Sequence, residues 1–104
     1  MKSNQESEYV LDLSQEARDD IRSILQYTFE TYGEAQADAY ENVLNKALVS
    51  IIGSPGIGHK RLDLPSDCRA FQAGQHLVIF RVEETVIYVL RILHGSMDIG
   101  RHFD

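Results

Sequence analysis

The hydrophobic pattern in the first half of the chain predicts a short strand followed by two helices. Residues 9–13 (YVLDL) are rich in strand-forming side chains and roughly alternate between apolar and polar positions, which is typical of a strand. Ser14 offers a helix N-cap, and the apolar positions after it recur every three or four residues until Gly33. A second stripe with the same spacing ends at Gly53. Because the connection at Gly33 is very short, we expect the two helices to form an antiparallel hairpin.

The hydrophobic period changes to that of β-structure in the second half of the chain. Residues 69–73, 76–82 and 85–93 are predicted to form three consecutive strands. They are separated by the dipeptides Gly-Gln at 74–75 and Glu-Glu at 83–84, a spacing typical of antiparallel hairpins. Because Glu-Glu is unfavourable in a tight primed turn, we expect the second loop to be wider than two residues.

The last predicted strand is apolar on both faces. Alternation places one set of side chains on each face: Val86, Tyr88, Leu90 and Ile92 on the first, and Ile87, Val89 and Leu93 together with Arg91 on the second. A strand with two apolar faces is typical of the centre of a sheet that is covered on both sides. The helical hairpin would cover one face, whereas the rest of the sequence offers little to cover the other.

The predicted fold is an α+β domain. It comprises an N-terminal strand, an antiparallel two-helix hairpin, a three-stranded antiparallel sheet and a short polar tail over residues 94–104. The length of 104 residues, with 43% apolar and 25% charged residues, fits one globular domain spanning 1–104. Within it, we expect residues 1–8 to be flexible. They contain no apolar core of a secretory signal, and no apolar run approaches the roughly 20 residues of a membrane span. With Cys68 as the single cysteine, no internal disulfide can form, so we expect a cytoplasmic protein.

The net charge of −6 is concentrated in the first half of the chain. Residues 1–52 hold ten acidic and four basic residues, whereas residues 53–104 hold six of each. The first half would therefore repel a nucleic-acid backbone. Its acid pair, Asp19 and Asp20, occupies adjacent helical positions that diverge, and we interpret it as a solvated surface feature.

The residues that could form cofactor or metal motifs do not have the spacing that such motifs require. The glycine-rich segment 53–60 resembles a phosphate loop, but its lysine comes one residue late, no Ser or Thr follows, and it leaves a helix rather than a strand. The four histidines lack metal-ligand spacing. Cys68 lies beside Arg69, but a lone small residue at a strand start is interpreted as a packing residue. We therefore expect no cofactor and no metal.

The predicted sheet and tail carry a group of basic side chains: Arg69, His76, Arg81, Arg91, His94 and His102. Arginine and histidine together can clamp a phosphodiester and supply a general acid and base. Equally, they can anchor the C-terminal tail or an acidic partner. His76 and Arg81 are five residues apart and must point to opposite faces of the sheet, so at best Arg81 and Arg91 share a face.

Several segments of the sequence match one family when taken in combination. They are Tyr9-Val-Leu-Asp-Leu-Ser-Gln-Glu-Ala17; Asp20-Ile21 with Ile24 and Tyr27; Tyr32-Gly33 with Gln36-Ala37 and Tyr40; Leu44, Leu48 and Ile52; Pro55 and Gly58; Arg69; Gly74-x-His76-x-Val78-x-Phe80; and Arg91-Ile-Leu-His94-x-x-Met97-Asp98-x-x-Arg101-His102. Over residues 9–103 the chain resembles the ParE branch of the RelE/ParE toxin superfamily. The terminal segment 91–102 is the most specific marker of this resemblance.

The resemblance implies the toxin of a type II toxin–antitoxin pair that stabilises a plasmid or chromosomal segment. Such a toxin forms a hetero-oligomer with a ParD-like antitoxin and contacts DNA only indirectly, through that antitoxin. ParE toxins act on DNA gyrase, whereas RelE relatives cleave mRNA on the ribosome. The negative charge of this chain, and a tail without Tyr or Lys, favour the gyrase-directed branch and hence a binding protein rather than an enzyme. Two alternatives stay open: a RelE-like endonuclease using Arg81, Arg91 and His94, or an inactive relic that still binds the antitoxin.

Two surfaces are predicted to carry these interactions. The antitoxin is expected to bind a helical stripe edged by arginines of the sheet: Ile21, Leu25, Tyr40, Leu44, Arg69 and Arg81. The target is expected to bind the C-terminal segment: Arg91, His94, Met97, Asp98, Arg101 and His102.

Overall fold

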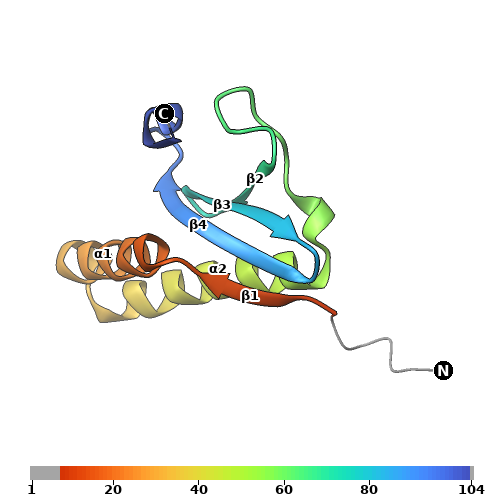
Figure 1. Ribbon diagram of the computed structural model, residues 1–104. Coiled ribbons are helices and arrows are strands. Elements are labelled where there is room, and N and C mark those ends of the chain that lie inside the picture. The colour runs from red at the N-terminus through yellow and green to blue at the C-terminus, as the bar shows by residue number, and fades with distance from the viewer. Residues whose placement is uncertain (1–7, 104) are drawn as a thin grey trace.

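The computed structural model describes residues 8–103 and has the predicted α+β architecture. Residues 1–7, most of the segment expected to be flexible, lie outside the described residues. The elements in chain order are β1 (Val10–Leu13), α1 (Gln15–Tyr32), α2 (Glu34–Gly53), the 3₁₀ turn η1 (Pro55–Ile57), β2 (Cys68–Ala73), β3 (His76–Glu83), β4 (Val86–His94) and the 3₁₀ turn η2 (Ile99–Phe103). The helical hairpin lies against one face of the sheet, and η2 and the segment before β2 lie on the opposite side (Figure 1). Within the described residues, neither helix has an apolar stretch long enough to cross a membrane.

The sheet has one strand more than expected. Its four strands run in the order β1-β4-β3-β2, with β1 parallel to β4 and the other pairs antiparallel. The predicted N-terminal strand is confirmed, but the expected three-stranded antiparallel sheet is corrected to a mixed sheet because β1 pairs with β4 from Val10↔Val86 to Leu13↔Val89. The strand β4 is central, as predicted from its two apolar faces.

A β-bulge changes which side chains of β4 face the helices. Phe80 of β3 is paired with Val89, but Ile79 is paired with Arg91, so Leu90 is an extra residue. A single extra residue shifts the alternation by one position. Ile92 therefore packs with Val89 on the helix side, and Leu90 packs on the far side. The prediction that Leu90 and Ile92 share a face is wrong for this reason.

Both faces of the sheet are covered by the chain itself. On the helix side, side chains of α1 and α2 pack on Val78, Phe80 and Ile87. On the far side, a smaller cluster combines strand residues with residues of the preceding loop and of the tail: Leu64, Cys68, Ala70, Ile79, Leu93 and Ile99. The expected lack of cover on this face is therefore wrong, because Leu64 and Ile99 are buried there despite the polar sequences around them.

The turns follow local backbone chemistry with one exception. Gly33 joins α1 to α2 at a φ of 97°, and Gly74 occupies the β2–β3 turn at 61°, both in the left-handed region that favours glycine. The β3–β4 turn contains only Glu84 and Thr85, because Glu83 and Val86 are already paired. The expectation of a wider loop is wrong: Glu84 itself adopts a φ of 56°, which a non-glycine residue does uncommonly.

Candidate functional site

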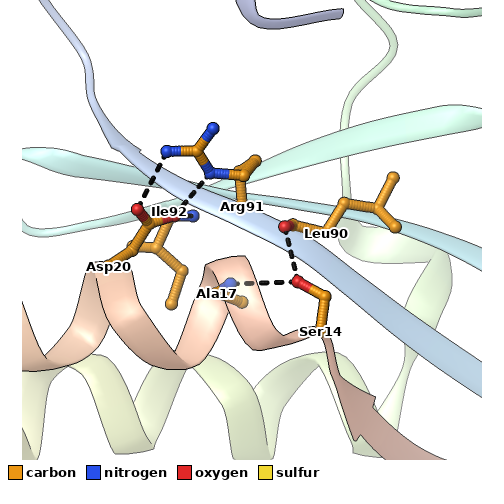
Figure 2. A network of polar contacts seen from close by, with 6 residues as sticks. All are labelled: Ser14, Ala17, Asp20, Leu90, Arg91 and Ile92. Carbon is orange, nitrogen blue, oxygen red and sulfur yellow. Dashed lines mark hydrogen bonds and ion pairs between the residues drawn. The ribbon is translucent and has the colours of Figure 1, made fainter.

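An ion pair joins the first helix to the central strand. The carboxylate of Asp20 accepts hydrogen bonds from Arg91 Nε at 2.8 Å, Arg91 Nη2 at 2.9 Å and the backbone N–H of Ile92 at 2.8 Å (Figure 2). The side chains are 14% exposed for Asp20 and 26% exposed for Arg91. The hydrogen bonds to Asp20 raise the pKa of Arg91, and burial opposes them. Arg91, predicted to touch the target, thus holds α1 on β4.

Ser14 completes the same junction. Its hydroxyl accepts a hydrogen bond from the N–H of Ala17 at 2.9 Å, which makes it the N-cap of α1 as predicted. The same hydroxyl donates to the carbonyl of Leu90, the bulge residue, at 2.8 Å (Figure 2). The pairing of β1 with β4 ends at Val89, so beyond it Ser14 and Asp20 satisfy backbone groups of β4 on the edge that β1 no longer covers.

Asp20 was missed by the sequence analysis. Interpreting the pair Asp19–Asp20 as solvated is correct for Asp19, which forms an exposed ion pair with Arg22, and wrong for Asp20. A signal was present, because Asp20-Ile21 is part of the family resemblance, whereas the partner Arg91 lies 71 residues away.

The other two arginines of the sheet have separate partners. Arg81 forms an ion pair with Glu83 at 3.1 Å, which raises the pKa of Arg81, and its guanidinium lies 4.7 Å from the centre of the Tyr88 ring. Arg69 donates to the carbonyl of Gly58 at 2.9 Å. Each guanidinium thus binds a different acceptor, and the structure forms no shared arginine clamp from Arg69, Arg81 and Arg91.

The predicted antitoxin stripe lies mostly on the inner side of the helical hairpin. Leu44 is a core residue, and Ile21, Leu25 and Tyr40 are partly buried against that core. Large apolar side chains that are exposed on the hairpin come from other positions of the two helices: Tyr27, Phe29, Tyr32, Val43 and Val49.

The predicted target surface is mostly solvent-accessible. Met97 is 41% exposed, and Asp98 pairs with Arg101 in an exposed ion pair at 3.3 Å. His102 is also exposed. His94, at the end of β4, accepts a hydrogen bond at Nδ1 from the backbone N–H of Ser96 at 3.1 Å.

A pocket of about 410 Å³ lies between the helical hairpin and the ends of β3 and β4. His76 and His94 are directly opposite each other in the strand register, with ring centroids 5.2 Å apart. The hydroxyl of Tyr40 lies 2.6 Å from His76 Nδ1 and accepts a hydrogen bond from the N–H of Gln75 at 2.9 Å. Burial, and then the nearby His94, lower the pKa of His76. The pocket therefore contains two imidazole rings and a hydroxyl group beside aromatic walls.

The potential metal ligands of the described residues are not clustered, and the single cysteine is buried. Within residues 8–103, no three histidine, cysteine or acidic side chains are grouped closely enough to hold a metal ion. Cys68 is buried in the far cluster, and burial raises the pKa of its thiol, as expected for the packing residue that the sequence predicted.

Comparisons with known proteins agree with the fold. Residues 11–99 match the family described as ParE toxin of type II toxin-antitoxin system, parDE. The chain is 32% identical over 90 residues to Toxin ParE1 of Caulobacter vibrioides, which covers 86% of this chain and 93% of that protein. It is 32% identical over 91 residues to Toxin ParE1 of Mycobacterium tuberculosis, with the same coverage of 86% and 93%. The solved structure "Chromosomal ParDE TA system from P. aeruginosa" shares the fold, with a TM-score of 0.72 and 18% identity over 83% of this chain and 95% of that one. This chain therefore belongs to the ParE toxin family of type II toxin–antitoxin systems.

Proposed function

We propose that this toxin inhibits DNA gyrase by binding it and that a ParD-like antitoxin neutralises the toxin by binding it in turn. The observation that carries the proposal is the internal pairing of an arginine that catalysis would need. The guanidinium of Arg91 is held by Asp20 in a largely buried ion pair and is therefore not available to stabilise the charge of a phosphoryl transition state, whereas the pair of Arg81 with Glu83 is exposed and weak. The net charge of −6 also opposes docking on RNA.

The exposed apolar side chains support a binding function. Tyr27, Phe29 and Tyr32 of α1 are each more than half exposed, and Val49 of α2 is 67% exposed. Aromatic side chains of this kind are enriched among the residues that dominate the binding energy of protein interfaces. A surface with this composition fits the attachment of partner proteins.

The antitoxin is proposed to bind the helical hairpin and the adjoining sheet. The similarity to a solved ParDE system supports a partner of this kind. We assign it the helical stripe together with two arginines of the sheet: Ile21, Leu25, Tyr40, Leu44, Arg69 and Arg81. Access to Leu44, which is 2% exposed, requires the antitoxin to displace neighbouring side chains. Through such a pair the toxin would stabilise the plasmid or chromosomal segment that encodes it.

The target is proposed to bind the C-terminal segment, where gyrase would contact the exposed side chains of Met97, Asp98, Arg101 and His102. Arg91 and His94 would shape this surface from β4. Replacing Met97 and Arg101 together by alanine should weaken inhibition without unfolding the protein, because both side chains are exposed and the ion pair of Arg101 with Asp98 is exposed too.

A second candidate function is cleavage of ribosome-bound mRNA with His94 among the catalytic groups. It is favoured by one observation, the facing pair His76 and His94, since two imidazoles can serve as acid and base. Under this alternative, His94→Ala would abolish cleavage, and the wild-type protein would cut mRNA on isolated ribosomes.

A supercoiling assay tests the proposed function. Purified toxin is titrated into gyrase with relaxed plasmid, and supercoiling should fall as toxin approaches gyrase in concentration. Addition of the antitoxin encoded beside the toxin gene should restore it. Unchanged supercoiling at a large excess of folded toxin would reject the proposal. Normal growth of cells that express the toxin alone would favour an inactive relic instead.

A further inference from the structure

The pocket beside the helical hairpin has walls of a particular chemistry. Three tyrosines line it, Tyr27 and Tyr32 from α1 and Tyr40 from α2, and His76 and His94 close it from the sheet. Tyr27 and Tyr32 are 62% and 67% exposed, so much of each side chain is available to an incoming group. Tyrosine rings attract cations through their negative faces.

The charged residues in the part of the hairpin that lines the pocket are all acidic. Residues 23–45, which supply most of its lining, contain four acidic side chains and no lysine or arginine: Glu30, Glu34, Asp38 and Glu41. All four are exposed. Each lies one or two residues along the chain from a tyrosine of the pocket, and because neighbouring helical positions point in different directions, the four carboxylates act on the pocket entrance through the net negative charge of this segment. The field at the pocket entrance therefore favours a cation and repels a phosphate.

The same chain already contains the contact that such a cation would make. Arg81 lies over the ring of Tyr88 at 4.7 Å. Arginine is better suited to this contact than lysine, because its planar guanidinium stacks on an aromatic ring and is more weakly hydrated.

We propose that the pocket formed by Tyr27, Tyr32, Tyr40, His76 and His94 binds an arginine side chain presented by a partner protein. The guanidinium lies against the exposed tyrosine rings, and the acidic side chains of the hairpin attract it. This inference goes beyond the proposed function, since it holds for any partner that carries the arginine and does not require gyrase to be the target.

The inference includes a dependence on pH. His76 faces Tyr40 from α2, His94 from β4 and, at longer range, Asp20 from α1. Burial keeps the pKa of His76 below its ordinary value, so its ring is neutral at pH 7. Protonation at lower pH places a positive charge in the pocket, and binding of the arginine should weaken as the pH falls.

The test is a titration of the full-length toxin by nuclear magnetic resonance. The probe is a blocked Gly-Arg-Gly peptide, and the matched control replaces arginine by citrulline, which has the same shape without the charge. The arginine peptide should shift the resonances of Tyr27, Tyr32 and His76 and bind roughly 3- to 30-fold more tightly than the citrulline peptide. Added salt should reduce this difference.

Variants of α1 distinguish binding of the peptide in the pocket from binding to exposed aromatic side chains in general. Tyr32→Leu and Tyr27→Leu should each weaken binding several-fold, whereas Phe29→Leu, which changes an exposed aromatic residue outside the pocket lining, should not. Equal binding of the two peptides, or loss of binding equally in the Phe29 variant, would overturn the proposal. A response to uridine or adenosine without a response to the arginine peptide would also overturn it and would indicate a nucleobase pocket. These results do not depend on gyrase: a toxin that does not inhibit gyrase should still bind the arginine peptide.

Discussion

The ion pair between Asp20 and Arg91 should make a large contribution to stability, and one substitution tests this. Asp20→Asn keeps the size of the side chain but removes the charge and leaves one oxygen for three N–H donors. Breaking a largely buried pair by changing one partner costs about 3–5 kcal/mol, and hydrogen bonds to a charged group are worth about 1.5–3 kcal/mol. Because both side chains retain some exposure, we expect a loss of about 2–4 kcal/mol in the free energy of unfolding.

The adjacent residue supplies a matched control. Asp19 pairs with Arg22 at 2.9 Å, but these side chains are 54% and 72% exposed, so Asp19→Asn should cost less than about 1 kcal/mol. For a domain of this size, about 1 kcal/mol corresponds to roughly 4–8 °C in Tm. Circular dichroism melts should therefore show a decrease of about 8–32 °C for Asp20→Asn and a small change for Asp19→Asn. Equal melting temperatures for the two variants would refute the reasoning.

A double-mutant cycle isolates the pair itself. Arg91→Met alone leaves Asp20 without its charged partner, and the double variant Asp20→Asn with Arg91→Met should be more stable than the sum of the single losses predicts. We expect a coupling energy of about 1–3 kcal/mol from urea denaturation. A coupling near zero would mean that the contact with the Ile92 N–H, rather than the ion pair, holds α1 on β4.

Three further predictions concern other parts of the fold. Gly58→Ala should lose about 1–3 kcal/mol, because a Cβ there would lie 2.7 Å from Phe80 Cζ, whereas Gly56→Ala, which meets no atom within 4 Å, should change stability little; urea denaturation of both variants checks this. The pKa of His76 is lowered in the folded protein, so on acidification the unfolded chain binds the proton first. Folding stability should therefore be constant from pH 8 to about 6.5 and then decrease as the pH falls, by at most about 1.4 kcal/mol per pH unit. Thermal melts across this pH range check the profile, and His76→Phe should lose the slope. Cys68 should react with a thiol reagent only after unfolding, since it is 3% exposed and burial raises its pKa; rapid labelling of the native protein would contradict this.

The features that the sequence predicts well are those that neighbouring residues determine. Ser14 caps α1 because its hydroxyl reaches an N–H three residues away, and Gly33 separates the helices because it adopts a φ that other residues avoid. The β2–β3 turn at Gly74 follows from the same backbone preference. Such signals require no knowledge of the rest of the chain.

The features that the sequence analysis missed depend on distant residues. The parallel pairing of β1 with β4 joins segments about 76 positions apart, as Val10↔Val86 shows, and nothing in the local pattern of residues 9–13 specifies that partner. No glycine near Leu90 signals the bulge in the sequence, and the carbonyl of Leu90 accepts its hydrogen bond from the distant Ser14. Glu84 adopts a left-handed conformation that its own side chain does not favour, because the pairing of Glu83 with Val86 leaves a two-residue loop, which favours a turn with a positive φ at its first position.

The residues of the candidate site likewise fall into those that local sequence predicts and those that depend on distant contacts. Met97, Arg101 and His102 belong to the terminal segment that carries the family resemblance, so the local sequence was enough to propose them as a target surface, and all three are exposed. By contrast, pairing of Arg91 with Asp20 depends on how α1 lies across the end of β4, which only the assembled fold determines. The pocket around Tyr40 and His76 likewise requires the hairpin to be in place.

The central claim, that the toxin acts by binding rather than by cutting RNA, is tested most directly by two titrations from one toxin preparation. One measures supercoiling by gyrase, and the other measures cleavage of mRNA on isolated ribosomes. We predict that supercoiling is inhibited near equimolar toxin and that the mRNA stays intact at the same concentrations. Cleaved mRNA together with undiminished supercoiling would contradict the claim.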